Sequence, residues 1–308
     1  MRIRATVAAV TGALALSALV IPSAAQADDA HRSTVSDVAR AAQSTAGAGA
    51  KSGARSLAAD STPVQLDLTF SKVTVNGGKP IVVGTAAKKT VPTTFTVTHA
   101  ADVNIFASDF VLGVDLYRGS FDVPTNELAS DALPTCKAVS STVATCKGQI
   151  DIRPQDDLIG NADATTWKAL GFAVDLNGQD PMDPDVNKIG FALQDGLGTA
   201  RVQRLSKLTV NAAPEPVKKG GTITVTGKLS RANFDDLKYH GYATQPVKLQ
   251  FRKKTSSTYT TIKTIKSSST GTLKTTVKAS VDGYWRYSFA GTTTTPAVSA
   301  AGDFVDVK

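Results

Sequence analysis

The sequence predicts an all-β protein that consists of two β-sandwich domains. From residue 64 onward, hydrophobic residues alternate with polar ones in short runs. Thr, Val and Phe dominate these runs, as strands prefer, and Gly, Pro and Asn separate them. Short strands at close intervals are typical of sandwiches, and 308 residues suffice for two domains of ordinary size.

The N-terminus has the features of an export signal. Arg2 and Arg4 precede an apolar run over residues 5–21, and the segment Pro-Ser-Ala-Ala-Gln-Ala follows it. A basic region, a hydrophobic region and a small-residue cleavage site in this order define a signal peptide. We therefore expect residues 1–27 to be removed and the mature protein to be secreted, extracellular and without a membrane span.

Residues 28–61 consist largely of Ala, Ser, Gly, Thr and scattered charges, with hardly any large apolar side chain. Such a segment buries too little surface to offset the entropy of ordering. We expect a flexible, disordered spacer here, with at most one frayed helical turn near residues 38–42.

The first sandwich is expected over residues 62–206. Cys136 and Cys146 are the only two cysteines, and an even count in an exported chain predicts a disulfide. Their spacing fits two strand ends around a turn, whereas a redox-active pair would need the C-x-x-C spacing. Alternating runs are expected to form strands at 64–70, 73–75, 94–98, 110–117, 143–152, 167–174, 190–193 and 200–205.

The second sandwich is expected over residues 207–308. Seven strands in about a hundred residues is the count of an immunoglobulin-like domain. No cysteine lies in this part of the chain, so the antibody-type disulfide is absent. The expected strands are 207–211, 221–229, 247–252, 258–265, 272–279, 284–289 and 304–308.

A family resemblance follows from these residues. The run 208–234, Pro246-Val-Lys-Leu-Gln-Phe-Arg-Lys-Lys and Asp282-Gly-Tyr-Trp-Arg-Tyr-Ser-Phe-Ala-Gly together resemble an immunoglobulin-like module of actinobacterial secreted proteins. The resemblance covers nearly all of residues 205–308. It implies an exported, immunoglobulin-like architecture in proteins that are mostly uncharacterised and sometimes labelled calcium-binding. No family site residue maps onto this chain.

Common catalytic patterns are missing from the sequence. Glu127 and Glu215 are the only glutamates, and there is no G-x-S-x-G, H-E-x-x-H or phosphate-binding glycine loop. The three histidines lie far apart in sequence, without a second ligand at metal spacing. We therefore expect a non-catalytic protein with no cofactor, unless it binds calcium.

One loop is a candidate calcium site. Hard oxygen ligands crowded in a loop are what Ca²⁺ prefers, although the pattern here departs from an EF-hand. The alternative is a solvated acidic loop between strands. The candidate ligands are Asp175, Asn177, Asp180, Asp183 and Asp185.

A looser acidic stretch lies upstream. It contains Asp151, Asp156, Asp157 and Asp163, and it joins the candidate calcium loop only if the fold brings both to one end of the domain.

Charge divides unevenly between the two domains. Residues 62–206 contain 12 basic and 16 acidic residues, whereas residues 207–308 contain 16 basic and 6 acidic ones, a net charge of +10. Alternation along the strands predicts a basic surface that suits cell-wall or other anionic polymers. Its proposed members are Lys248, Arg252, Lys254, Lys263 and Lys274. The alternative is that these lysines keep strand edges soluble.

The sequence thus predicts a secreted structural or adhesive module that binds anionic cell-envelope polymers through its second domain, with calcium binding as the alternative. Nucleic acid is not expected as a partner, because no base-reading motif is present. Trp285 is expected in the core of the second domain and not on a ligand-stacking surface. The sequence leaves the oligomeric state open.

Overall fold

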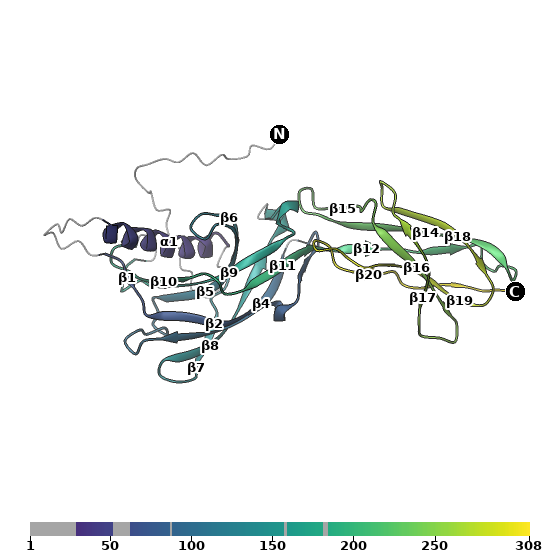
Figure 1. Ribbon diagram of the computed structural model, residues 1–308. Helices are drawn as coiled ribbons and strands as arrows, with labels where there is room; N and C mark the ends of the chain where they lie inside the picture. The colour runs from purple at the N-terminus through teal and green to yellow at the C-terminus, as the bar shows by residue number, and fades with distance from the viewer. Residues whose placement is uncertain (1–28, 52–61, 87, 157–158, 181–183) are drawn as a thin grey trace.

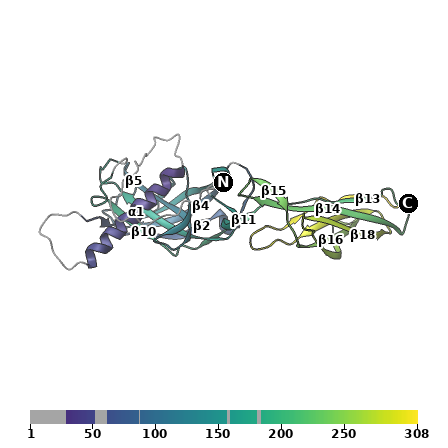
Figure 2. The same cartoon turned by 90° about the horizontal axis from the view of Figure 1, so that it is seen from above.

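The computed structural model describes residues 29–51, 62–86, 88–156, 159–180 and 184–308. Two β-sandwiches follow one another along an elongated molecule (Figure 1 and Figure 2). The all-β prediction is confirmed. The expected signal peptide, residues 1–27, lies outside the described part of the chain. No helix within that part is long and apolar enough to cross a membrane.

The larger sheet of the first sandwich has seven strands, and β9 is at its centre, pairing with β5, β10 and β11. Its strands are β1 (Val64–Gln65), β3 (Ile81–Val83), β5 (Phe110–Gly119), β6 (Pro124–Leu128), β9 (Thr166–Asp175), β10 (Gly190–Gln194) and β11 (Thr199–Arg204). The described loops of this domain contain the short 3₁₀ helices η1 (Asn76–Gly78), η2 (Pro154–Asp156) and η3 (Asn161–Asp163).

The second sheet of this domain runs in the order β2-β4-β8-β7. Its strands are β2 (Leu68–Val75), β4 (Lys89–His99), β7 (Thr135–Ala138) and β8 (Val143–Ile152). Cys136 and Cys146 are direct partners across β7 and β8 and form the predicted disulfide. The hydrophobic core between the two sheets includes Phe70, Phe95 and Trp167.

The structure corrects the predicted spacer over residues 29–51, whereas residues 28 and 52–61 lie outside the described part of the chain. Residues Asp29–Lys51 form the helix α1, which lies on the outer face of the seven-stranded sheet (Figure 1). Val35, Val38, Ala39 and Ala42 are buried, and their i, i+3, i+4, i+7 spacing places them on one side of the helix. The stripe is weakly hydrophobic because its members are small. Its burial depends on large residues of the sheet beneath it.

An ion pair fixes α1 to the sheet. Arg40 Nη1 lies 2.8 Å from Glu127 Oε2 on β6, and both side chains are about nine-tenths buried. The Ser36 hydroxyl donates to the other oxygen of Glu127 at 2.9 Å. Burial raises the pKa of Glu127, although the contacts with Arg40 and Ser36 oppose that effect.

The second sandwich matches the predicted strands closely. One sheet contains β12 (Ser206–Leu208), β13 (Asn211–Ala213), β14 (Gly221–Asn233), β15 (Lys238–Gly241) and β18 (Thr272–Ala279). The other contains β16 (Pro246–Lys253), β17 (Thr260–Lys266), β19 (Gly283–Phe289), β20 (Val298–Ser299) and β21 (Asp303–Val305). Trp285 is 3% exposed and belongs to the core, as predicted.

The two sandwiches share a packed junction. Ala232, near the end of β14, and Phe234, just after it, are buried in the hydrophobic core of the first sandwich. Arg204 Nε donates to the Ala232 carbonyl at 2.6 Å, and the Asn161 side chain accepts from the Phe234 amide at 3.1 Å. The C-terminal end of β14 therefore contributes to the fold of both sandwiches.

Candidate functional site

The structure separates the residues of the predicted basic surface. Lys248 and Arg252 lie on the outer face of β16, since Leu249 and Phe251, which alternate with them, face the core. Lys254 follows the end of β16, where its ammonium lies 5.3 Å from the centre of the Phe304 ring. Arg252 and Lys254 therefore share one solvent-facing region, and Lys248 lies further along the same face.

Lys263 and Lys274 lie elsewhere. Lys263 pairs in register with the buried Leu249, and its ammonium donates to Thr275 Oγ1 at 3.1 Å and to the Thr276 carbonyl at 2.9 Å. It therefore crosses from the edge of one sheet to the edge of the other. Lys274 is on β18 in the opposite sheet. The prediction of a single surface that contains all five residues is wrong at these two positions.

The outer face instead carries alternating cations and aromatic rings. The Arg252 guanidinium lies 3.8 Å from the centre of the Tyr284 ring and 5.4 Å from that of Tyr259. Arg286 lies 3.8 Å from the same Tyr259 ring, and the rings of Tyr284 and Phe304 are 5.2 Å apart. We call this set the cation–aromatic face: Arg252, Lys254, Tyr259, Tyr284, Arg286 and Phe304.

Strand register explains the assembly of this face. Arg252 pairs with Tyr284 across β16 and β19, and Tyr284 pairs with Phe304 across β19 and β21. Directly paired residues point to the same side of a sheet, so the three side chains lie in a row. Tyr259 reaches this row from the turn before β17, and its hydroxyl lies close to Gly302.

The two arginines of this face are held in place without carboxylates. Arg252 Nη1 donates to the Ser256 carbonyl at 2.8 Å, and Arg286 Nε donates to Gln250 Oε1 at 2.8 Å. Among the described residues, the ion pairs of the second domain involve His240, Lys254 and Lys308, and neither arginine takes part in one. Two guanidinium charges that share the Tyr259 ring therefore have no carboxylate partner in the part of the chain that the structure describes.

The predicted calcium loop is hydrogen-bonded within itself where it is described. The Asp175 carboxylate accepts from the Asn177 amide at 3.1 Å, and the Asn177 side chain donates to the Lys188 carbonyl at 3.0 Å. Asp185 accepts from the Asn187 amide at 3.0 Å and pairs with Lys188, and these contacts lower its pKa.

The metal prediction is not tested at every position. No group of three or more acidic, His or Cys side chains in the described ranges could hold a metal ion. Asp183 lies outside the described residues, and calcium binding by this loop stays a prediction.

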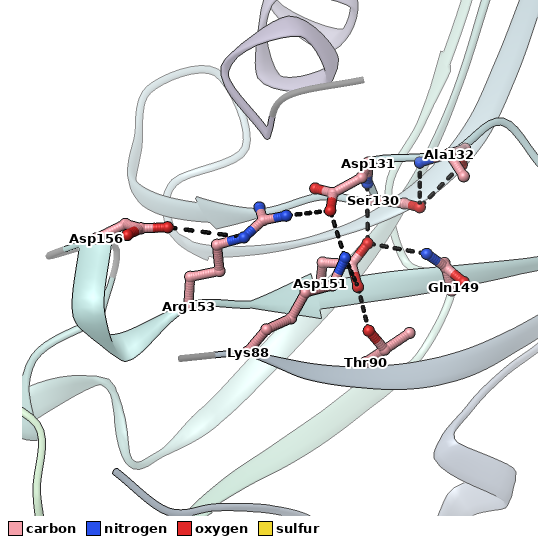
Figure 3. A network of polar contacts seen from close by, with 9 residues as sticks. All are labelled: Lys88, Thr90, Ser130, Asp131, Ala132, Gln149, Asp151, Arg153 and Asp156. Atoms are coloured by element: carbon pink, nitrogen blue, oxygen red, sulfur yellow. Dashed lines mark hydrogen bonds and ion pairs between the residues drawn. The ribbon is translucent and has the colours of Figure 1, made fainter. Parts of the chain in front are cut away.

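The upstream acidic stretch is described except at Asp157, which lies outside the described residues, and its other members have partners away from this loop. Asp163 pairs with Arg118, and Asp151 belongs to a polar network at the ends of β4 and β8 (Figure 3). The Asp151 side chain is fully buried, and it accepts from Thr90 Oγ1, from the Asp131 amide at 2.9 Å and from Gln149 Nε2 at 3.0 Å.

Two cations complete the network. Lys88 lies between Asp131 and Asp151, with its ammonium 3.1 Å from the latter, and Arg153 pairs with Asp131 from the other side (Figure 3). Burial alone would raise the pKa of Asp151, but its hydrogen bonds and Lys88 outweigh burial and hold that pKa below its ordinary value. Burial likewise opposes the charge of Lys88, yet its two ion pairs hold the Lys88 pKa above its ordinary value. An amine held protonated is a poor nucleophile, so Lys88 is not suited to covalent catalysis. The network instead joins the ends of β4 and β8 through ion pairs.

Sequence reasoning identified Arg252 and Lys254 but missed Arg286, Tyr284 and Phe304 as members of the cation–aromatic face. A signal was present, because Tyr284, Arg286 and Ser288 alternate with the buried Trp285 and Tyr287. That alternation marks an outer face of β19. Its partners on β16 and β21 follow only from the register.

Comparisons with known proteins do not assign a family. No protein-family model and no curated protein matches the chain. Among solved structures, the D00–D0 domain of Intimin is 15% identical over 76% of this chain and 98% of its own, with a TM-score of 0.24. The full ectodomain of mouse nectin-like molecule 4 is 11% identical over 79% of this chain, which spans 65% of that ectodomain, with a TM-score of 0.23. The Yersinia pseudotuberculosis adhesin InvE is 12% identical over 77% of this chain and 56% of its own, with a TM-score of 0.22. At these TM-scores the similarities carry no conclusion about family or function.

Proposed function

We propose that the protein is a secreted, non-catalytic binding module whose cation–aromatic face attaches it to anionic polymers of the cell envelope. The observation that carries this proposal is the pair of guanidiniums, Arg252 and Arg286, which lie over one tyrosine ring without a carboxylate partner among the described residues. A guanidinium presents several donors in a rigid, planar fork that matches carboxylate and phosphate groups.

The charge of the second domain supports the same partner. Its net charge of +10 over residues 207–308 attracts polyanions over a distance, whereas the first domain is mildly acidic. Stacking on Tyr259 and Tyr284 pre-orders the arginine side chains, which lowers the entropy that binding must overcome. The face would therefore bind through charge and through pre-organised donors together.

The test is cosedimentation of the protein with purified cell wall that contains teichoic or uronic polymers. We expect binding at low salt that added salt weakens, because exposed charges are screened. Replacing Arg252 and Arg286 with Gln should weaken binding about tenfold or more, since each 1.4 kcal/mol lost is a factor of ten.

The matched control is Lys228→Gln with Lys274→Gln, which removes the same charge from the opposite sheet. Equal melting temperatures of the two double variants would show that both are folded. The proposal fails if the wild type does not sediment at low salt. It also fails if the control variant loses as much binding as the arginine variant, because net charge alone would then account for it.

A further inference from the structure

The second sandwich has an open side between two edge strands. β17 is the outer strand of one sheet, where it pairs with β16, and β18 is the outer strand of the other, where it pairs with β14. A groove of about 500 Å³ lies along this side. Its lining residues are Thr222, Phe251, Ile262, Lys263, Thr276, Val277, Lys278, Ser280 and Trp285.

One part of the lining is apolar and incompletely covered. Phe251 packs against Trp285 with ring centres 4.6 Å apart, and Val277 extends this surface from β18. Ile262 is 46% exposed at the edge of the groove. It is the extra residue of a bulge in β17, because the register with β16 shifts between Leu249 and Gln250.

Trp285 adds a buried polar group. Its side chain is almost completely buried, and its indole N–H has no hydrogen-bond acceptor among the described residues. Buried donors without acceptors are rare in folded proteins and are costly, so each one calls for a physical cause. An acceptor group or a water brought in by a bound molecule would remove this cost.

The remaining lining is cationic and hydroxylic. Lys263 is held at the groove by its bonds to Thr275 and Thr276, and Lys278 lies on the neighbouring strand. Three hydroxyl side chains complete the rim, and none of the described lining residues carries a carboxylate. The charge of the site therefore favours an anionic group next to the apolar surface.

We propose that this groove binds a small anionic amphiphile, namely a carboxylate or sulfonate that carries an acyl chain or an aromatic ring. The apolar part would cover Phe251, Ile262 and Val277, and the anion would contact Lys263 and Lys278. This site is separate from the cation–aromatic face. Phe251 and Trp285 alternate with Arg252 and Tyr284 along the same two strands, so the two sets lie on opposite sides of one sheet.

The test uses 8-anilinonaphthalene-1-sulfonate as a probe with the folded protein. We expect saturable fluorescence enhancement with one site, and displacement of the probe by decanoate but not by decyltrimethylammonium. Lys263→Gln with Lys278→Gln should weaken probe binding about five- to tenfold, whereas Lys228→Gln with Lys274→Gln should not. Thr222→Tyr should obstruct the groove without removing any charge.

Binding in the groove and binding at the cation–aromatic face respond to different variants. Arg252→Gln with Arg286→Gln should retain probe binding, because neither arginine lines the groove. If the protein does not bind cell-envelope polymers, the proposed amphiphile site can therefore still be tested by itself. Because Lys263 also bonds to β18, Lys278→Gln alone and Thr222→Tyr test the site if the double variant does not fold. The proposal is overturned if Thr222→Tyr binds the probe like wild type, or if the cationic amphiphile displaces it as well as decanoate does.

Discussion

The outer faces of the two sandwiches differ in what covers them. In the first sandwich, the face of β9 and β10 carries Phe172 and Phe191, and α1 buries both. In the second, the face of β16 and β19 carries half-buried Arg252, Tyr284 and Arg286, and no described helix covers them. The first face therefore contributes to stability, whereas the second is available to a partner.

Several cations follow the same division, although Lys254 and Lys308 of the second domain also form ion pairs. In the first domain, Lys88, Arg118 and Arg153 all pair with carboxylates of their own fold. In the second domain, Arg252 and Arg286 stack on tyrosine rings. A cation that is paired with a carboxylate of its own fold attracts an anionic ligand weakly, because its charge is already neutralised. A cation that is held only by aromatic rings keeps its net charge and attracts such a ligand more strongly.

The largest expected effect is the loss of a large side chain beneath α1. Phe172→Ala removes a fully buried ring and should lower the free energy of unfolding by roughly 3–5 kcal/mol. Tyr284→Ala is the matched change on the open face, and we expect a loss below about 1.5 kcal/mol. Chemical denaturation measures both. Similar losses would mean that the two faces do not differ as described.

A smaller effect is expected from the helix side of the covered face. Val38 is 2% exposed, so Val38→Asp places a charge against the sheet and should cost about 2–3 kcal/mol of helix docking. Gln43→Asp introduces the same charge on the exposed side of α1 and serves as control. Hydrogen exchange of the amides in α1 should quicken in the first variant alone. Unchanged protection in Val38→Asp would show that α1 does not depend on this contact.

The paired charges of the first domain predict a pH dependence. Because the folded-state pKa of Asp151 is lowered, its contribution is fully present above its unfolded value and is lost as the pH falls through the folded value. Asp151→Asn should lower the free energy of unfolding at neutral pH by about 1.5–2 kcal/mol and flatten its fall in acid. Denaturation at a series of pH values measures this. An acid limb as steep as that of wild type would contradict the network's role.

The smallest expected effect concerns the acidic loop. A calcium site at residues 175–185 with the affinity of an extracellular module predicts about 0.4–1.4 kcal/mol of stabilisation at millimolar Ca²⁺. Thermal melts with EDTA and then with Ca²⁺ measure the shift, which Asp180→Ala with Asp183→Ala should remove. A wild-type melt that Ca²⁺ leaves unchanged would withdraw the calcium prediction.

The strands of the second domain could be predicted from sequence because period-two alternation is strong there. The helix α1 could not be predicted from hydrophobicity, since its buried stripe is Val35, Val38, Ala39 and Ala42. The helical spacing of these residues was the available signal. The stripe contributes to stability because it packs on the aromatic surface of β9 and β10, and those strands are remote from α1 in sequence.

The basic surface was predictable in composition but not in arrangement. Alternation shows which residues of one strand share a face, but it does not show which face of a neighbouring strand joins them. Register turns Lys263 toward β18 and brings Arg286 beside Tyr259. Sheet membership then places Lys274 on the other sheet. The positions of Lys263, Lys274 and Arg286 therefore all depend on pairing between distant segments of the chain.

The most direct test of the open face is hydroxyl-radical footprinting of the protein with and without a soluble polyuronate. We expect Tyr259, Tyr284 and Phe304 to be oxidised in the free protein and protected by the polymer. Phe106, which is 53% exposed in the first domain, should react equally in both samples. Phe172, beneath α1, should react in neither. Equal oxidation of Tyr259, Tyr284 and Phe304 with and without bound polymer would contradict the assignment of this face as the binding surface.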